Sequence, residues 1–238
     1  NLDTFLQLAY DPYLPAFSFL IPELLGSVSA TLPAAYAPAM EQLRTWDYRT
    51  SKESVAMSIA HFYGENYQRR FRSLNRFAQE DPKAKVPNSS EIQAVFIQTI
   101  EQMTRDFGTW NTPWGEINRF QRISGAIDAD FDDSKPYVPV GLASGNWGAL
   151  AAYGARATST TKRLYGYRGN SFVAVVEFGT KVRAKSMLAG GQQADSNSPH
   201  FFDQGQRYAD AQFKEVAFYR EDVEKRNVTS YHPGERQK

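Results

Sequence analysis

Residues 172–188 read FVAVVEFGTKVRAKSML and show the strongest strand pattern in the chain. Strand-forming residues dominate the first arm and recur in the second, and Gly179-Thr180-Lys181 separates the arms with residues typical of a turn. The pattern predicts a β-hairpin with strands over 172–178 and 182–188. Because a two-stranded hairpin is not stable alone, these strands need partners, and the chain offers few other strand signals.

The sequence before this hairpin is helical. Asp3 is expected to cap a short helix that ends near Tyr10. The stretch Thr50-Ser51-Lys52-Glu53 has the spacing of a capping box ahead of a long amphipathic helix. Asn88-Ser89-Ser90-Glu91 is expected to start a second long helix that Gly108 ends. The buried face predicted for that helix is Ile92, Val95, Phe96, Thr99, Ile100 and Met103.

Helices followed by strands predict an α+β fold rather than alternating βαβ units. We expect a mainly helical segment over 1–124 and a strand-rich segment over 125–238, which form one structural unit completed by other chains. A short helix is expected over 203–210 and a last strand over 216–219, with a polar tail from Lys225.

Composition excludes several classes of protein. Lys and Arg number 27 against 26 Asp and Glu, so the net charge of +1 gives no general attraction to nucleic acid or anionic membrane. The chain has no cysteine and three histidines, which excludes thiolate chemistry and argues against a multi-histidine metal site. No apolar run approaches the roughly 20 residues that span a bilayer. No cofactor is expected.

Three motifs resemble functional sites, but for each of them a purely structural role is the favoured interpretation. Ser198, His200 and Asp203 have the residue types of a hydrolytic triad but are too close in sequence to converge on one atom. Residues 128–133 alternate carboxylates as calcium loops do, but lack the glycine and the closing glutamate, which favours a solvated turn. A basic stretch could bind nucleic acid, although nearby carboxylates favour a solvated helix face. Its cations are Arg69, Arg70, Arg72, Arg76, Lys83 and Lys85.

Glu177 interrupts the apolar run of the predicted strand over 172–178. Period-two alternation places it on one face with Val173 and Val175. A carboxylate buried on that face needs a partner, and it would either pair structurally or orient a catalytic group.

Several stretches together resemble the C-terminal part of the penicillin-amidase-like acylases, which include penicillin and cephalosporin acylases, aculeacin-type acylases and acyl-homoserine-lactone acylases. The most specific is the block at 190–204, which contains Gly-Gly-Gln-Gln and Ser-Pro-His-Phe-Phe-Asp-Gln. The others are Leu43–Asp47, Trp114–Arg119, Val138–Gly141 and Gly169–Phe178.

The resemblance implies an N-terminal-nucleophile hydrolase with an αββα sandwich, which the strands of this chain would complete together with other segments. In such enzymes a precursor cleaves itself, and the new N-terminal serine attacks an amide with its own α-amine as base. This chain begins with Asn1 rather than serine, and nothing before Leu43 resembles the nucleophile region of the family. We therefore expect the nucleophile and the oxyanion-binding asparagine to lie on a segment absent from this chain.

The resemblance also implies a role for Glu177. In cephalosporin and glutaryl acylases a carboxylate on a similar strand pairs with a histidine near the nucleophile, so Glu177 is expected to orient a histidine on another segment. The expected partners are the α chain and the N-terminal part of the β chain, with an N-acyl small molecule as substrate: a β-lactam, an acyl-homoserine lactone or a lipopeptide. Family members are exported, so a periplasmic or secreted protein is expected. The alternative is a non-catalytic binding or structural module that retains the acylase C-terminal fold.

Overall fold

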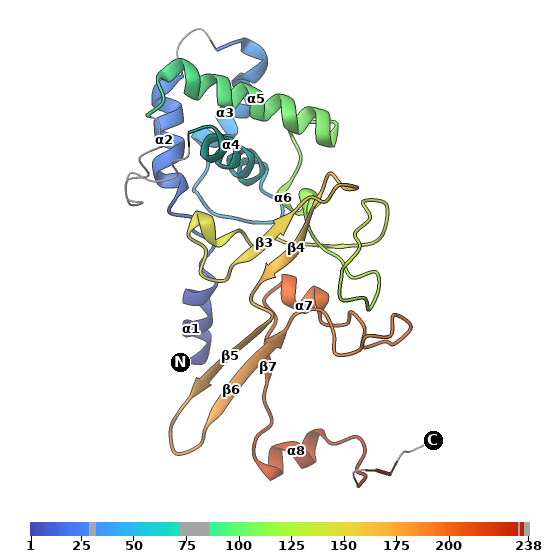
Figure 1. The fold of residues 1–238 in the computed structure, drawn as a ribbon. Helices are drawn as coiled ribbons and strands as arrows, with labels where there is room; N and C mark the ends of the chain where they lie inside the picture. The colour runs from blue at the N-terminus through green and yellow to red at the C-terminus, as the bar shows by residue number, and fades with distance from the viewer. Residues whose placement is uncertain (29–31, 72–85, 233, 236–238) are drawn as a thin grey trace.

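The computed structural model of the protein describes residues 1–28, 32–71, 86–232 and 234–235. Most of the helices precede the strands, which confirms the predicted α+β class (Figure 1). The helices are α1 (Leu2–Ala9), α2 (Phe17–Ser27), η1 (Ala34–Tyr36), α3 (Ala37–Arg44), α4 (Val55–Phe71), α5 (Ser89–Phe107), α6 (Trp114–Ile117), η2 (Gly145–Trp147), α7 (Gly205–Ala209) and α8 (Arg220–Arg226). The strands are β1 (Asn118–Phe120), β2 (Val138–Pro139), β3 (Tyr153–Arg156), β4 (Leu164–Gly169), β5 (Phe172–Glu177), β6 (Arg183–Leu188) and β7 (Lys214–Glu215).

Helix α4 runs through the middle of the helical part, in contact with α2, α3, α5 and α6 (Figure 1). Every residue from Ala56 to Gly64 is buried, so the helix has no wide polar face there. An amphipathic helix would expose a polar face to solvent, and this part of the prediction was wrong for residues 56–64. Helices and the segment that carries Trp147 cover different sides of α4 there.

Helix α5 follows its sequence signals closely. The Asn88 side chain accepts a hydrogen bond from the Glu91 N–H at 3.0 Å, and the Glu91 carboxylate accepts one from the Asn88 N–H at 3.1 Å. Gly108 ends the helix with a φ of +85°, which residues with a side chain rarely adopt. All six residues of the predicted inner face are buried.

Two other helix starts were predicted wrongly. Asn1, not Asp3, caps α1, because the Asn1 side chain accepts a hydrogen bond from the Thr4 N–H at 3.0 Å. Residues 50–53 do not cap α4, which begins at Val55. There the Ser54 hydroxyl accepts a bond from the N–H three residues later at 3.0 Å.

The strands form two small sheets, with orders β2-β1-β4-β3 and β5-β6-β7. Strand β1 pairs in parallel with β4, so residues from the segments over 1–124 and 125–238 share one sheet. A compact core of Val140, Tyr153, Met187 and Tyr208 lies where the second sheet meets the first. In Figure 1 the second sheet extends away from the group of helices α2, α3, α4 and α5, with α1 beside β5.

The predicted hairpin is confirmed: β5 and β6 pair antiparallel from Phe172↔Leu188 to Glu177↔Arg183. The last strand was misplaced, because β7 is Lys214–Glu215 and precedes the predicted 216–219. Helix α8 covers part of the segment expected to be a polar tail. Among the described helices, none has the length and apolar character needed to cross a lipid bilayer.

Candidate functional site

One face of α4 presents titratable side chains at intervals of four residues: His61, Glu65 and Arg69. His61 is 8% exposed, and its Nδ1 accepts a hydrogen bond from the Trp147 indole N–H at 3.0 Å. Because Nδ1 is an acceptor, the ring proton is on Nε2. Burial lowers the pKa of His61 to about 3, so the ring is neutral at physiological pH.

The approach of Trp147 to His61 depends on Gly64, one turn further along α4. A Cβ atom at Gly64 would lie 2.6 Å from Cη2 of the Trp147 ring, closer than side-chain atoms pack. Trp147 is fully buried, and it follows Ser144, whose hydroxyl accepts a bond from the Asn146 N–H at 3.2 Å. Helix backbone without a side chain thus forms the surface on which the indole lies.

A cavity of about 390 Å³ opens beside this face of α4. Its inner wall holds buried side chains, including His61, Trp114 and Asn118, and its outer wall carries the exposed side chains of Arg156 and Arg168. Its full lining is His61, Phe62, Glu65, Arg69, Trp114, Asn118, Ser144, Asn146, Tyr153, Gly154, Ala155, Arg156, Ala157, Leu164, Tyr167 and Arg168. The cavity thus combines aromatic walls with several cations, in the size range of small-molecule sites.

Two groups in this cavity have unusual surroundings. Burial raises the pKa of Glu65, an effect that the Arg69 charge partly opposes. Asn118 is fully buried, and its side-chain NH₂ donates to the carbonyls of Val140 and Leu142, both at 2.9 Å. Those two acceptors fix the orientation of the amide, and its Oδ1 has no hydrogen-bond partner among the described residues.

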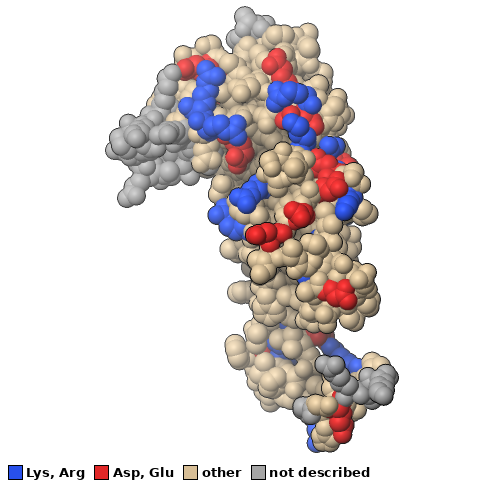
Figure 2. Space-filling view, turned by 45° about the vertical axis from the view of Figure 1, so that its right-hand side comes forward, with Lys and Arg blue, Asp and Glu red and all other residues tan. Residues whose placement is uncertain are grey.

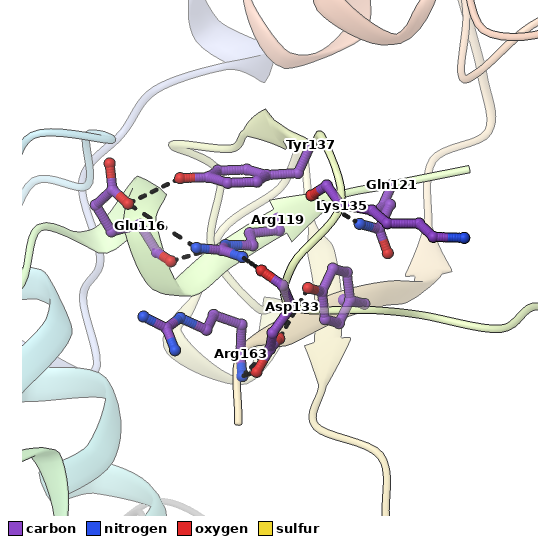
Figure 3. A network of polar contacts seen from close by, with 8 residues as sticks. Glu116, Arg119, Gln121, Asp133, Lys135, Tyr137 and Arg163 are labelled. Atoms are coloured by element: carbon purple, nitrogen blue, oxygen red, sulfur yellow. Dashed lines mark hydrogen bonds and ion pairs between the residues drawn. The ribbon is translucent and has the colours of Figure 1, made fainter. Parts of the chain in front are cut away.

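Strand β1, which carries Asn118, is held by a buried guanidinium (Figure 3). Arg119 is 4% exposed; its Nε donates to the Glu116 carbonyl at 2.9 Å and its Nη1 to the Asp133 carbonyl at 3.2 Å. The Tyr137 ring lies over the same guanidinium, 3.6 Å from Cζ to the ring centroid. The Tyr137 hydroxyl donates to the Glu116 carboxylate at 2.8 Å. Figure 3 shows these groups from β1, α6 and the loop before β2 converging on one cation.

Two carboxylates of the calcium-like stretch, Asp132 and Asp133, serve this scaffold. Asp133 accepts hydrogen bonds from the Lys162 N–H at 2.8 Å and the Tyr165 hydroxyl at 2.9 Å. Asp132 accepts from the Ser134 N–H at 2.8 Å. No group of three or more His, Cys, Asp or Glu side chains that could hold a metal ion occurs among the described residues.

The triad-like residues also form a turn. The Ser198 hydroxyl accepts a bond from the His200 backbone N–H at 3.2 Å, while the His200 ring lies 3.1 Å from the Asp203 carboxylate. That hydrogen bond from His200 lowers the pKa of Asp203. The serine oxygen meets the histidine backbone and not its ring, so the three residues are not arranged for nucleophilic attack.

Glu177 lies at the end of β5, next to the hairpin turn, and faces Arg183 across the strand pair. The Arg183 Nε donates to its carboxylate at 2.9 Å, and the Glu177 side chain is 37% exposed. The hydrogen bonds found for His61 and His200 do not involve Glu177. In the described structure its partner is thus an arginine of the same hairpin.

The predicted basic segment lies only partly within the described residues. Arg69 and Arg70 end α4, while Arg72, Arg76, Lys83 and Lys85 fall outside the described ranges. On the face seen in Figure 2, cationic and anionic side chains alternate without a large area of one sign. This face offers no extended surface for a polyanion.

Sequence reasoning missed the cavity. The His61, Glu65 and Arg69 spacing was a usable signal, because residues four apart share one helix face. The other wall could not be found in this way, since Asn146, Arg156 and Arg168 are far away in sequence and reach α4 only through the fold.

Comparison with known proteins agrees with the resemblance seen in the sequence. The penicillin amidase family profile matches residues 1–225. Among solved structures, the thermostable penicillin G acylase from Alcaligenes faecalis is similar, with 14% sequence identity and a TM-score of 0.43 over 96% of this chain. The match covers 48% of that protein, so this chain spans about half of its length. On the extent of the family match, the chain belongs to the penicillin amidase family.

Proposed function

We propose that this chain is part of an amide hydrolase that cleaves the N-acyl bond of a small molecule. In the proposed reaction the hydroxyl of an N-terminal serine, on a segment outside this chain, attacks the amide carbon. The C–N bond breaks, the amine leaves with a proton, and water then releases the acyl group as a carboxylic acid. Family membership supports the acylase chemistry. In the described residues, the serine and histidine of the triad-like stretch, Ser198 and His200, form a turn.

One structural observation carries the proposal that other segments complete this chain: the second sheet has an exposed apolar face. Every second residue of β5 points to the outer face of this sheet: Phe172, Ala174 and Val176. Phe172 is 63% exposed and Val176 is 44% exposed. The register places Val216, which is 43% exposed and follows β7, on the same side of the sheet. Apolar surface gathered in this way is typical of an interface.

The free edge of the same sheet strengthens this argument. Among the described residues β5 pairs with β6 alone, so its other edge presents unpaired N–H and C=O groups. Such an edge is a template for another strand, and natural proteins cover or pair it. We propose that strands from other chains of the same precursor lie there and complete the αββα sandwich, and that the assembled protein is periplasmic or secreted.

Within this proposal Glu177 orients a histidine of the missing segment. Its carboxylate is partly exposed and hydrogen-bonded by Arg183, which leaves an oxygen for a second donor. Glu177→Gln in the assembled enzyme should lower kcat/KM at least tenfold, mainly through kcat, and shift the pH–rate profile. Arg183→Met is the matched control, because it breaks the same cross-strand pair while keeping the carboxylate. Equal effects of the two variants would mean that Glu177 is purely structural.

The assembly itself is tested by intact mass spectrometry and gel filtration of the protein from its natural source. We expect this chain to co-elute with partner chains, one of which starts with serine. A stable lone monomer would contradict the proposal and support the alternative, a non-catalytic module with the acylase C-terminal fold.

A further inference from the structure

Two cations at the outer wall of the α4 cavity have no carboxylate partner among the described residues. Arg156 of β3 and Arg168 of β4 both lie against the ring of Tyr167, with Cζ 4.5 Å and 5.5 Å from its centroid. Among the described residues no carboxylate forms an ion pair with either guanidinium. Two like charges held at one ring repel each other, and a bound anion would relieve that repulsion.

The strand pairing explains why these arginines converge. In the register of β3 and β4, Arg168 lies opposite Gly154, and the pairing shifts by one residue between Gly154 and Ala155. This irregularity places Arg156 opposite Tyr165, and both guanidiniums reach Tyr167. The two charges are therefore positioned by the sheet.

The interior of the cavity offers apolar surface and a hydrogen-bond donor, the His61 Nε2–H. Phe62, Trp114, Tyr153 and Leu164 supply buried apolar surface. The His61 Nε2–H has no acceptor among the described residues, because its hydrogen bond to Trp147 uses Nδ1. An N–H donor that lines a cavity and has no acceptor among the described residues is available to bond an atom of a ligand or a water molecule.

We propose that this cavity binds a small aromatic or aliphatic carboxylate, with the carboxylate between Arg156 and Arg168 and the apolar body against Trp114 and Leu164. A ligand that carries an acceptor atom opposite its carboxylate also takes the His61 Nε2–H. Glu65 also lines the cavity and disfavours an anion beside it, so the negative group is expected at the arginines. The site consists of residues of this chain alone and does not depend on the proposed hydrolysis.

Calorimetric titration of the purified protein with benzoate, benzamide and benzylamine tests the proposal, because these probes share a ring and differ in charge. We expect benzoate to bind at least tenfold more tightly than benzamide, benzylamine not to bind, and benzoate affinity to fall with added salt. 4-Acetylbenzoate, whose ketone lies opposite the carboxylate, should bind several-fold more tightly than benzoate. Inorganic phosphate should bind more weakly than benzoate, because it leaves the apolar wall unfilled.

Two variants locate the site. The double variant Arg156→Gln, Arg168→Gln should reduce benzoate affinity at least tenfold and leave benzamide affinity within twofold. Arg220→Gln, the same substitution at one exposed arginine of α8 that pairs with Glu224, should leave both affinities unchanged. Equal affinities for the three ring probes, phosphate binding as tight as benzoate, or an unchanged affinity in the double variant would each overturn the proposal. Because binding is measured without turnover, a failure to bind benzoate overturns this proposal alone, whereas the hydrolase proposal is tested separately through the partner chains and the Glu177 variant.

Discussion

Replacing Gly64 with alanine should lower the free energy of unfolding, although alanine is the better helix former. Helix propensity alone would favour the variant by about 1 kcal/mol. The new Cβ, however, would lie 2.6 Å from Cη2 and 2.9 Å from Cζ3 of Trp147. Because that ring is fully buried, it has no free space to enter, and such overpacking costs about 1–3 kcal/mol.

A displaced indole would also lose its hydrogen bond to His61. An unpaired buried donor and acceptor add about 1–3 kcal/mol. After the gain in helix propensity is subtracted, we expect a net destabilisation of about 1–5 kcal/mol. Part of the strain should reach the cavity, because His61 lines its inner wall.

Urea unfolding followed by tryptophan fluorescence measures this effect. Gly26→Ala is the matched control: Gly26 lies in α2, and a Cβ there would meet no atom within 4 Å. That variant should be as stable as the parent protein or slightly more so. In Gly64→Ala, the indole N–H resonance of Trp147 should also move in an NMR spectrum, because its acceptor is lost. If Gly64→Ala is as stable as Gly26→Ala, the argument that bare backbone positions Trp147 is refuted.

Three further predictions concern stability. Between pH 6.5 and pH 3 the histidine of the unfolded chain binds a proton that folded His61 excludes. Lowering the pH through this window should therefore lower the free energy of unfolding by up to about 5 kcal/mol. His61→Gln should remove this part of the slope in urea titrations, and an unchanged slope would contradict the assignment. Asn88→Ala removes the α5 cap and should cost about 1 kcal/mol in thermal unfolding, whereas Asn88→Asp should cost much less. Arg119→Met deletes the guanidinium beneath Tyr137 and should cost about 2–4 kcal/mol in urea unfolding, and a loss below about 0.5 kcal/mol would show that the network is dispensable.

The candidate sites differ in how much of each could be predicted from the sequence. Glu177 could be singled out because a charge within an apolar strand is visible in the sequence. Its observed partner Arg183 depends on the turn that sets the hairpin register. The α4 cavity was not predicted, since its lining combines α4 with residues from three later segments, over 114–118, 144–146 and 153–168.

The sequence by itself determined the helices and strands whose ends depend on residues close by in the chain. The cap of α5, its inner face and the glycine that ends it lie within one stretch, and the β5–β6 hairpin follows from strand formers on either side of a short turn. Tertiary structure alone decided the burial of α4 and the environment of His61. Its hydrogen-bond partner is 86 residues away, and the desolvation that keeps the ring neutral comes from aromatic side chains that only the fold brings together.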